Sequence, residues 1–276
     1  MGKIEYTSGK PEYTRLVPAV DQAARVLLCL SRNASASMSL TDICESVGIY
    51  KSKGYSILNT LQKFGFILKD PATKTYSLGL GLISLSRKVL DGLNDNKMAT
   101  PLLETLAGRT RSTAFYGILS DENIFVVAKR EEERTVSVTI RVGYRFHVTH
   151  GAHGKAIVAF MEEHERKKLL QQRRLFFYGR ASSFDRRRFD AELARCREMG
   201  YAFDMGELNP GINVIASPVF DAHEYPKGCM FVMGTFPESL VEEYGPLVAE
   251  SARRLSSMLG SRGTRCRQPP GALPGS

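Results

Sequence analysis

The chain has 276 residues, of which 43% are hydrophobic, and a formal net charge of +9 with an isoelectric point near 9.3. This length suits two globular domains better than one, and the basic balance favours an anionic partner. Because no apolar run could span a bilayer or serve as a secretion signal, we expect a cytoplasmic protein with no membrane association. The five cysteines are scattered without a C-x-x-C pair, which argues against a cysteine-ligated zinc site and predicts buried, reduced thiols.

The first predicted helix follows a polar segment. Residues 1–15 lack apolar periodicity, which predicts a flexible arm. Pro18 suits the first turn of a helix, since its fixed φ and its missing N–H cost nothing there. Apolar residues then recur at helical spacing, at Val20, Ala23, Ala24, Leu27 and Leu30. We expect this helix to be the base on which the next two helices pack.

Two short amphipathic helices meet at a tight turn between Ser39 and Leu61. Ser39 stands three residues before Asp42 and can cap the free backbone N–H groups of the first helix. Gly48 follows that helix and can adopt the left-handed conformation in which helices often end. On the first helix, the spacing of Leu40, Ile43 and Val47 places them on one face. This pattern predicts a helix-turn-helix.

The second helix of the motif begins near Lys51 and has two contrasting faces. Lysine and hydroxyl groups contact phosphates, and asparagine, serine and lysine read base edges in a major groove, so an outward face of such residues predicts a DNA-recognition helix. The inward stripe contains Gly54, Ile57, Leu58 and Leu61. The outward face carries Ser52, Lys53, Tyr55, Ser56 and Asn59, with no carboxylate among them.

A hairpin follows the recognition helix. Phe66 to Leu68 form an apolar run, Asp70 to Thr73 have the composition of a turn, and a second strand ends at Leu78. Residues 51–74 contain five lysines and a single acidic residue, so the local field attracts polyanions. We therefore predict a winged helix-turn-helix. The candidate DNA contacts are Lys51, Ser52, Lys53, Tyr55, Ser56, Asn59, Lys63, Lys69 and Lys74.

A further helix is predicted over residues 78–93. Leucine and valine side chains recur along one side of this helix and form an apolar seam. The seam either pairs with a second copy of the chain or packs on its own domain, and the spacing of its residues is compatible with both arrangements. Pairing would give two recognition helices that read a roughly palindromic operator. Gly79 and Gly81 weaken its first turn, and the polar run Asn94–Asn96 marks the expected domain boundary. The seam consists of Leu78, Leu82, Leu85, Val89 and Leu93.

Beyond the boundary the pattern mixes strands and helices. Strands before and after a helical middle indicate an α+β domain with an antiparallel sheet. The expected strands are Ser112–Leu119, Asn123–Lys129, Arg134–Val142, Ile212–Phe220 and Cys229–Phe236. The expected helices contain Leu102–Ala107, open at Gly154 and Asp185, and close the domain over Pro237–Leu259. We expect residues 16–78 to form the winged helix-turn-helix, 79–96 a linker helix, 97–260 the second domain and 261–276 a disordered tail.

In this order the parts resemble the isocitrate-lyase-regulator (IclR) family of bacterial transcription factors over roughly residues 16–260. The resemblance rests on GIYKSKGYSILNTL at 48–61, YSLGLGLISL at 76–85, HGAHGKAIVAF at 150–160 and REMGYAFDMGELNPGINVIASPVFD at 197–221. It implies a winged helix-turn-helix that binds DNA as a dimer, often as a dimer of dimers, and a C-terminal GAF-like domain that binds a small effector. It also implies a repressor or activator of a nearby catabolic operon. We expect neither an enzymatic activity nor a cofactor.

The resemblance also implies an effector site between the sheet, the loop before the G-K-A helix and two C-terminal strands. Carried onto this sequence, the site contains Ala152, His153, Asp204, Val214, Phe231 and Met233. Several members have Cys or Ser at the last three positions, where this chain has apolar side chains. We therefore expect a small organic acid with an apolar or aromatic body and a polar end near Asp204 or His153. The alternative is that Phe231 or Met233 only packs in the core.

Three histidines cluster near the G-K-A helix, at His147, His150 and His153. Imidazoles can ligate zinc or nickel, and Asp204 could join them, but the spacing is not that of a closed zinc site, so we predict no resident metal. Two other functions stay open: a second domain that retains an enzymatic activity, and a scaffold that has lost DNA affinity. The enzyme alternative lacks a Ser/His/Asp or Cys/His grouping and a phosphate-binding loop, while salt-sensitive DNA binding would exclude the scaffold.

Overall fold

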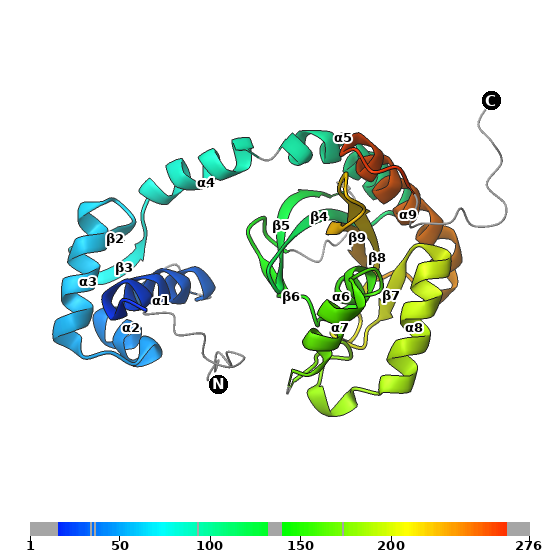
Figure 1. The fold of residues 1–276 in the computed structure, drawn as a ribbon. Coiled ribbons are helices and arrows are strands. Elements are labelled where there is room, and N and C mark those ends of the chain that lie inside the picture. Colours follow the sequence, from blue (N-terminus) through cyan, green and yellow to red (C-terminus); the bar gives the residue numbers. More distant parts are fainter. Residues whose placement is uncertain are drawn as a thin grey trace. The chain divides into compact units, whose positions relative to one another are not determined.

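The structure is a computed structural model that describes residues 16–33, 35, 37–92, 94–131, 140–172 and 174–263. The expected arm at 1–15 and most of the expected tail, 264–276, lie outside these residues. The chain divides into two compact units, Met1–Gly92 and Leu93–Ser276 (Figure 1). In the part of the chain that the structure describes, no helix has both the length and the apolar character needed to cross a membrane.

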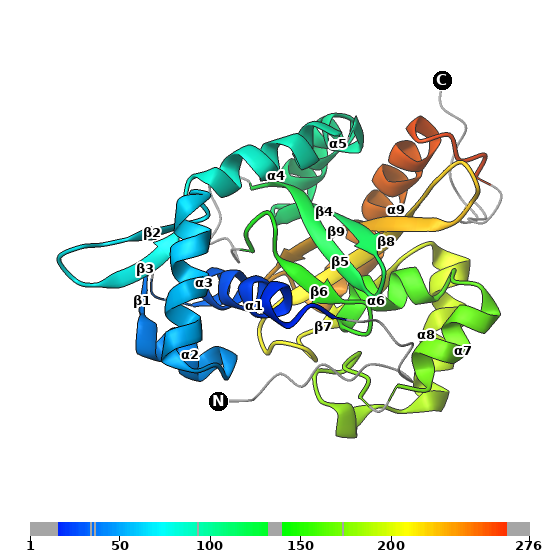
Figure 2. The same ribbon diagram turned by 60° about the vertical axis from the view of Figure 1, so that its left-hand side comes forward.

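The first unit combines packed helices with a small antiparallel sheet (Figure 2). Its helices are α1 (Pro18–Arg32), α2 (Leu40–Val47), α3 (Lys51–Lys63) and α4 (Gly81–Gly92). Its sheet has the order β1-β3-β2, from strands β1 (Met38–Ser39), β3 (Thr75–Leu78) and β2 (Ile67–Lys69). The predicted helix-turn-helix and hairpin are confirmed. The sequence did not predict β1, because a strand of two residues shows no alternation.

The caps of the helix-turn-helix explain where its helices begin and end. The Ser39 hydroxyl accepts the N–H of Asp42 at 3.2 Å and donates to the Asp42 carboxylate at 2.7 Å. Gly48 ends α2 with φ of 76° and donates its N–H to the carbonyl of Cys44. Both residues act as their local chemistry predicts, so this part of the fold is encoded within a few residues.

Helix α1 presents a different stripe to the core from the one that periodicity predicts. Val20 is 66% exposed and Ala24 is exposed, whereas Val26 is completely buried. The packed stripe consists of Ala23, Val26, Leu27 and Leu30. The prediction was wrong at Val20 and Ala24 because two overlapping apolar stripes exist on this helix, and the partner helices decide which one is covered.

The second unit is an α+β structure around a six-stranded antiparallel sheet, as predicted. The sheet has the order β6-β5-β4-β9-β8-β7. Its strands are β4 (Thr113–Ser120), β5 (Asn123–Arg130), β6 (Arg145–His147), β7 (Ala202–Met205), β8 (Asn213–Phe220) and β9 (Pro226–Gly234). The expected strand Arg134–Val142 lies mostly outside the described residues, and its described end, 140–142, is not in a strand.

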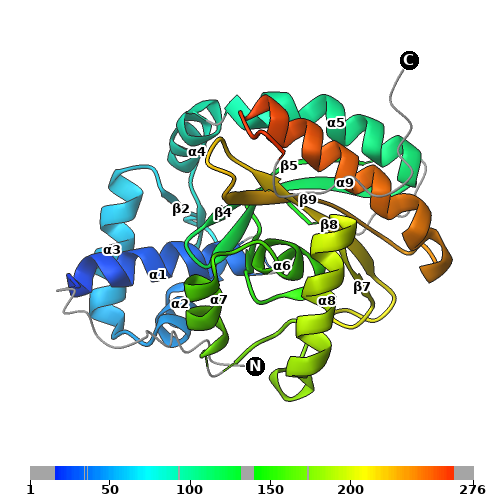
Figure 3. The same ribbon diagram turned by 45° about the vertical axis from the view of Figure 1, so that its right-hand side comes forward.

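Helices cover both faces of this sheet (Figure 3). Helices α5 (Asn94–Thr110) and α9 (Val241–Met258) pack side by side on one face. The other face carries α6 (Gly151–Val158), α7 (Glu163–Leu170) and α8 (Arg186–Met199). Short 3₁₀ turns, Ala181–Ser183 and Glu238–Leu240, precede α8 and α9.

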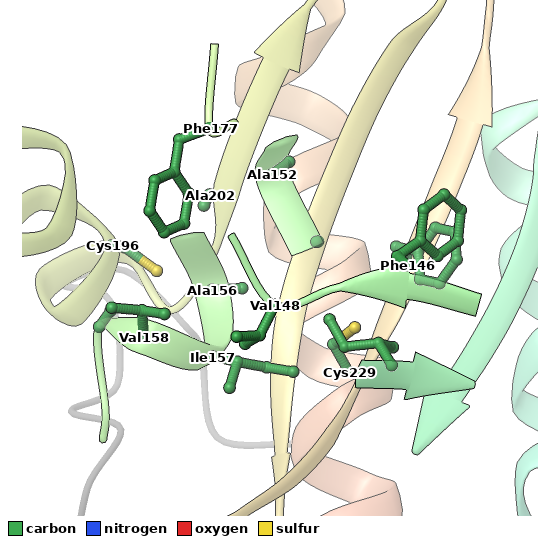
Figure 4. Packing of buried hydrophobic residues seen from close by; sticks show 14 of the residues in the cluster. Phe146, Val148, Ala152, Ala156, Ile157, Val158, Phe177, Cys196, Ala202 and Cys229 are labelled. Atoms are coloured by element: carbon green, nitrogen blue, oxygen red, sulfur yellow. The ribbon is translucent and has the colours of Figure 1, made fainter. Parts of the chain in front are cut away.

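Neighbouring residues on each central strand belong to different cores. In β4, Phe115 joins the apolar cluster under α6 and α8, and Tyr116 joins the cluster under α5 and α9. The same alternation separates Phe231 from Val232 in β9. Figure 4 shows the first cluster, where Phe146, Val148, Ala152 and Ile157 pack between helix and sheet. A sheet buried on both faces explains the nearly continuous apolar runs of β8 and β9.

Candidate DNA interface and effector site

Helix α3 buries the predicted inward stripe of Gly54, Ile57, Leu58 and Leu61. The nine candidate DNA contacts are all exposed: Lys51, Ser52, Lys53, Tyr55, Ser56, Asn59, Lys63, Lys69 and Lys74. No Asp or Glu occurs anywhere in α3, so its open face is cationic. A face of this composition suits the phosphates and base edges of a duplex.

Hydrogen bonds within α3 restrict what its hydroxyl groups can do. Ser56 Oγ donates to the carbonyl of Ser52 at 3.1 Å, and Thr60 Oγ1 donates to the carbonyl of Ser56 at 2.8 Å. A hydroxyl has one proton, so in this arrangement Ser56 is left only as an acceptor toward DNA. Lys53 and Asn59 are therefore the better candidates for donors to base edges and phosphates.

The wing is held against the recognition helix through Lys69. Its ammonium lies 5.9 Å from the ring centre of Tyr55 on α3 and 5.5 Å from that of Tyr76 on β3. At the tip, the Asp70 carboxylate accepts the N–H groups of Ala72 and Thr73, which lowers the pKa of Asp70. The tip and base of the wing thus have defined conformations before DNA binds.

One residue that the sequence analysis missed is Tyr50. It occupies the N-cap position of α3 without a side-chain cap bond, and its side chain is 88% exposed. The signal that could have identified it is its position, since the residues at the start of a recognition helix lie closest to the bases.

The second unit brings the six candidate effector residues together under the α6 side of the sheet. Asp204 on β7 pairs with Val214 on β8, which pairs with Met233 on β9. The rings of Phe231 and His153 have centres 5.8 Å apart. The exposed fraction is at most 5% for each of Ala152, His153, Asp204, Val214, Phe231 and Met233.

Two details differ from the expected site. Helix α6 begins at Gly151, three residues before the predicted start, so Ala152 and His153 lie in its first turn and not in a preceding loop. Phe231 is fully buried and stacks on Phe115 with ring centres 4.9 Å apart. Phe231 therefore packs in the apolar core and also faces the His153 ring, and its contact with an effector stays a prediction.

His153 has the least satisfied polar side chain in this region. Neither ring nitrogen has a hydrogen-bond partner, although the residue is only 1% exposed. Burial, followed by the nearby His150, lowers the pKa of His153 to about 3, so the ring is neutral at pH 7. A neutral imidazole offers one donor and one acceptor, and leaving both unpaired costs about 1–3 kcal/mol for each group. A polar ligand would remove that cost.

The start of α6 adds further donors beside His153. The first N–H groups of a helix have no partner within it, and the His150 side chain does not cap them. The helix dipole also favours negative charge at this end. Asp204 is less available, because its carboxylate already accepts the N–H of Glu207 at 2.7 Å and that of Leu208 at 3.4 Å. Burial nevertheless raises the pKa of Asp204.

Lys155, two residues further along α6, is held in a separate polar network. Its ammonium is 2.7 Å from the Glu192 carboxylate and 3.3 Å from that of Glu207, and it lies over the Tyr178 ring. Arg188 pairs with both carboxylates. A cavity of about 270 Å³ lies between this network and β7, and none of the six candidate effector residues lines it.

The three clustered histidines each have protein contacts of their own, and His150 Nδ1 lies 3.2 Å from the carbonyl oxygen of His147. His147 Nδ1 lies 2.8 Å from Thr149 Oγ1, and the His150 ring stacks on Phe176 with centres 5.2 Å apart. His153 packs against Phe146. Among the described residues, no three His, Cys, Asp or Glu side chains are grouped so that they could hold a metal ion.

A winged helix-turn-helix with a cationic recognition face, followed by an α+β unit, defines a DNA-binding transcriptional regulator. Residues 19–71 match the profile described as the IclR helix-turn-helix domain, and residues 87–257 match the bacterial transcriptional regulator IclR C-terminal domain. The chain belongs to the IclR family of transcriptional regulators.

Individual relatives agree with this assignment. The chain is 30% identical to the HTH-type transcriptional regulator XynR of Escherichia coli over 209 residues, which are 76% of this chain and 82% of the relative. An IclR transcriptional regulator from Alicyclobacillus acidocaldarius superposes with a TM-score of 0.78 at 30% identity, covering 89% of this chain and 100% of the other. These relatives, like the transcriptional repressor IclR of Escherichia coli, are transcriptional regulators.

A third comparison concerns the fold alone. An IclR homologue from Microbacterium hydrocarbonoxydans, crystallised in complex with 4-hydroxybenzoate, has a TM-score of 0.74 at 18% identity. The match covers 87% of this chain and 98% of that one.

Proposed function

We propose that this protein is an effector-responsive regulator of a bacterial catabolic operon that binds duplex operator DNA in the cytoplasm. The single observation that supports effector sensing best is the buried His153 ring, whose two nitrogens have no partner. A polar group in an apolar core is costly, and a ligand that pairs with it gains the corresponding free energy. The stability of the second unit would then depend on the concentration of that ligand.

The surroundings of His153 favour an organic acid with an aromatic body. Phe146 and Phe231 both pack against the imidazole, with ring centres 4.3 and 5.8 Å away, and supply apolar surface. The uncapped start of α6 would receive the carboxylate, and His153 would donate to it or to a second polar group. A strongly hydrated two- or three-carbon acid would cover little of this apolar wall.

A thermal-shift screen tests the effector class. At about 100-fold above its dissociation constant, benzoate or 4-hydroxybenzoate should stabilise the second unit by about 2.7 kcal/mol, which corresponds to a rise in Tm of about 5–10 °C. His153→Leu should abolish the shift, whereas the same change at the exposed His164 should preserve it. Stabilisation by glyoxylate or pyruvate, but not by the aromatic acids, would refute the proposed effector class.

The proposed DNA surface is tested by single substitutions on α3. Lys53→Ala and Asn59→Ala should each weaken binding to DNA from upstream of the gene about tenfold or more, and Lys53→Ala should reduce the salt slope by about 1. Fluorescence anisotropy at several salt concentrations measures both effects. Lys167→Ala in the second unit is the matched control. Unchanged affinity in both α3 variants would place the reading surface elsewhere.

We also propose that the protein acts as a homodimer or as a dimer of dimers. Helix α4 and the residue before it expose large apolar side chains: Leu80 at 71%, Ile83 at 60%, Leu85 at 53% and Val89 at 64%. Ile83 and Leu85 are two positions apart and lie on different sides of α4, and we propose that a second copy of the chain covers this exposed apolar surface. Two recognition helices would then address two half-sites of one operator.

A further inference from the structure

Tyr50 is the most exposed large apolar side chain among the described residues, at 88%. It is also held on a rigid backbone. Its carbonyl accepts the N–H of Gly54 at 2.9 Å, which closes the first turn of α3, and the preceding Ile49 N–H donates to the carbonyl of Cys44 at 3.0 Å. The ring is therefore presented by an ordered turn, although packing within its own unit does not require it.

The exposed aromatic side chain within α3, that of Tyr55, has a different role. The Tyr55 ring is 48% exposed and lies beneath the Lys69 ammonium, so it contributes to holding the wing. Among the described residues, no ammonium, guanidinium or aromatic ring is in contact with the Tyr50 ring. An aromatic ring gains free energy when it is removed from water, so a fully presented ring is best explained by a surface that covers it.

The proposal concerns the DNA bases, since DNA binding is the function that the family assignment establishes. In a helix-turn-helix, the residues at the N-terminal end of the recognition helix contact base edges in the major groove. Of the groups displayed there, the C5-methyl of thymine is the apolar one. A phenol ring at the start of α3 is chemically matched to it.

We propose that Tyr50 is a specificity-determining residue, whose ring packs on the C5-methyl of one thymine in each half-site of the operator. The adjacent Lys51 attracts phosphates without regard to sequence. Tyr50 adds a preference for one base at one position. This role explains why the large Tyr50 side chain is exposed to solvent at the start of a cationic helix.

The experiment selects binding sites from a random duplex library with four full-length proteins: the unchanged protein, Tyr50→Ala, Tyr50→Phe and Phe64→Ala. Phe64 is the matched control, because it is 63% exposed at the opposite end of α3. We expect Tyr50→Ala to lose the preference for thymine at one position of each half-site and to bind about tenfold more weakly. Tyr50→Phe and Phe64→Ala should select the same motif as the unchanged protein.

Replacing that thymine by uracil removes only the methyl group. The unchanged protein should then bind about fourfold more weakly, which corresponds to about 0.8 kcal/mol for one buried methyl-sized group, and Tyr50→Ala should not distinguish the two bases. The thermal stability of Tyr50→Ala should equal that of the unchanged protein. An identical motif and affinity for Tyr50→Ala would overturn the proposal. If the unchanged protein selected no motif, sequence-specific DNA binding would itself be wrong.

Discussion

Replacing Lys155 by methionine is expected to lower the free energy of unfolding of the second unit by about 3 kcal/mol. The ammonium is 1% exposed and pairs with Glu192 and Glu207, which would be left close together with Arg188 as their shared cation. Burial alone would raise the pKa of Glu192, but Lys155 and Arg188 hold it below its ordinary value. The two carboxylates are about a quarter exposed, at 23% and 26%, so water moderates the loss.

Hydrogen exchange of the α6 and α8 amides measures this loss within the second unit, and urea unfolding measures it globally. The matched control is Lys167→Met. Lys167 pairs with Glu163 at 2.6 Å, but both side chains are 68% exposed, so we expect no measurable change in stability. Equal stability of the two variants would show that the buried pairs contribute no more than the surface pair.

Replacing Gly79 by alanine is expected to destabilise the first unit by about 3 kcal/mol and to weaken DNA binding about tenfold. An added Cβ would lie 2.2 Å from the carbonyl oxygen of Gly65 and 2.9 Å from the backbone nitrogen of Ile67. Backbone atoms cannot rotate away as a side chain can. The strand ends at the base of the wing would have to separate, which displaces Lys69 and Lys74.

Thermal unfolding followed by circular dichroism and operator binding by anisotropy check both effects. Gly108→Ala is the control, because a Cβ there meets no atom within 4 Å inside α5. That change should stabilise its helix by about 1 kcal/mol through helix propensity. If Gly79→Ala behaved like Gly108→Ala, the close approach at the wing base would not constrain this residue.

At Gly79, the sequence pattern did not show that the tertiary structure leaves no room for a side chain. In the sequence it only weakens the first turn of a helix predicted to begin at Leu78. In the structure that helix begins at Gly81, and the N–H of Gly79 donates to the carbonyl of Phe66 at 2.8 Å. The residue is a contact point between two strands, and helix periodicity carries no information about such contacts.

Short elements were the other source of error. Strands β6 and β7 contain three and four residues, too few for alternation to be recognised against the surrounding loops. The early start of α6 was missed because glycine and histidine are weak helix formers. β6 and β7 are edge strands, and each pairs with a longer strand, β5 and β8 respectively.

The sequence by itself determined the recognition motif, because helix caps, a tight turn and an amphipathic stripe depend on residues three or four positions apart. Ser39, Gly48 and the buried stripe from Gly54 to Leu61 are examples. Only the tertiary structure decided that the His153 ring packs against Phe231 with neither of its nitrogens in a hydrogen bond. Strand order and register bring together residues more than fifty positions apart, and no local pattern specifies which polar groups remain unpaired.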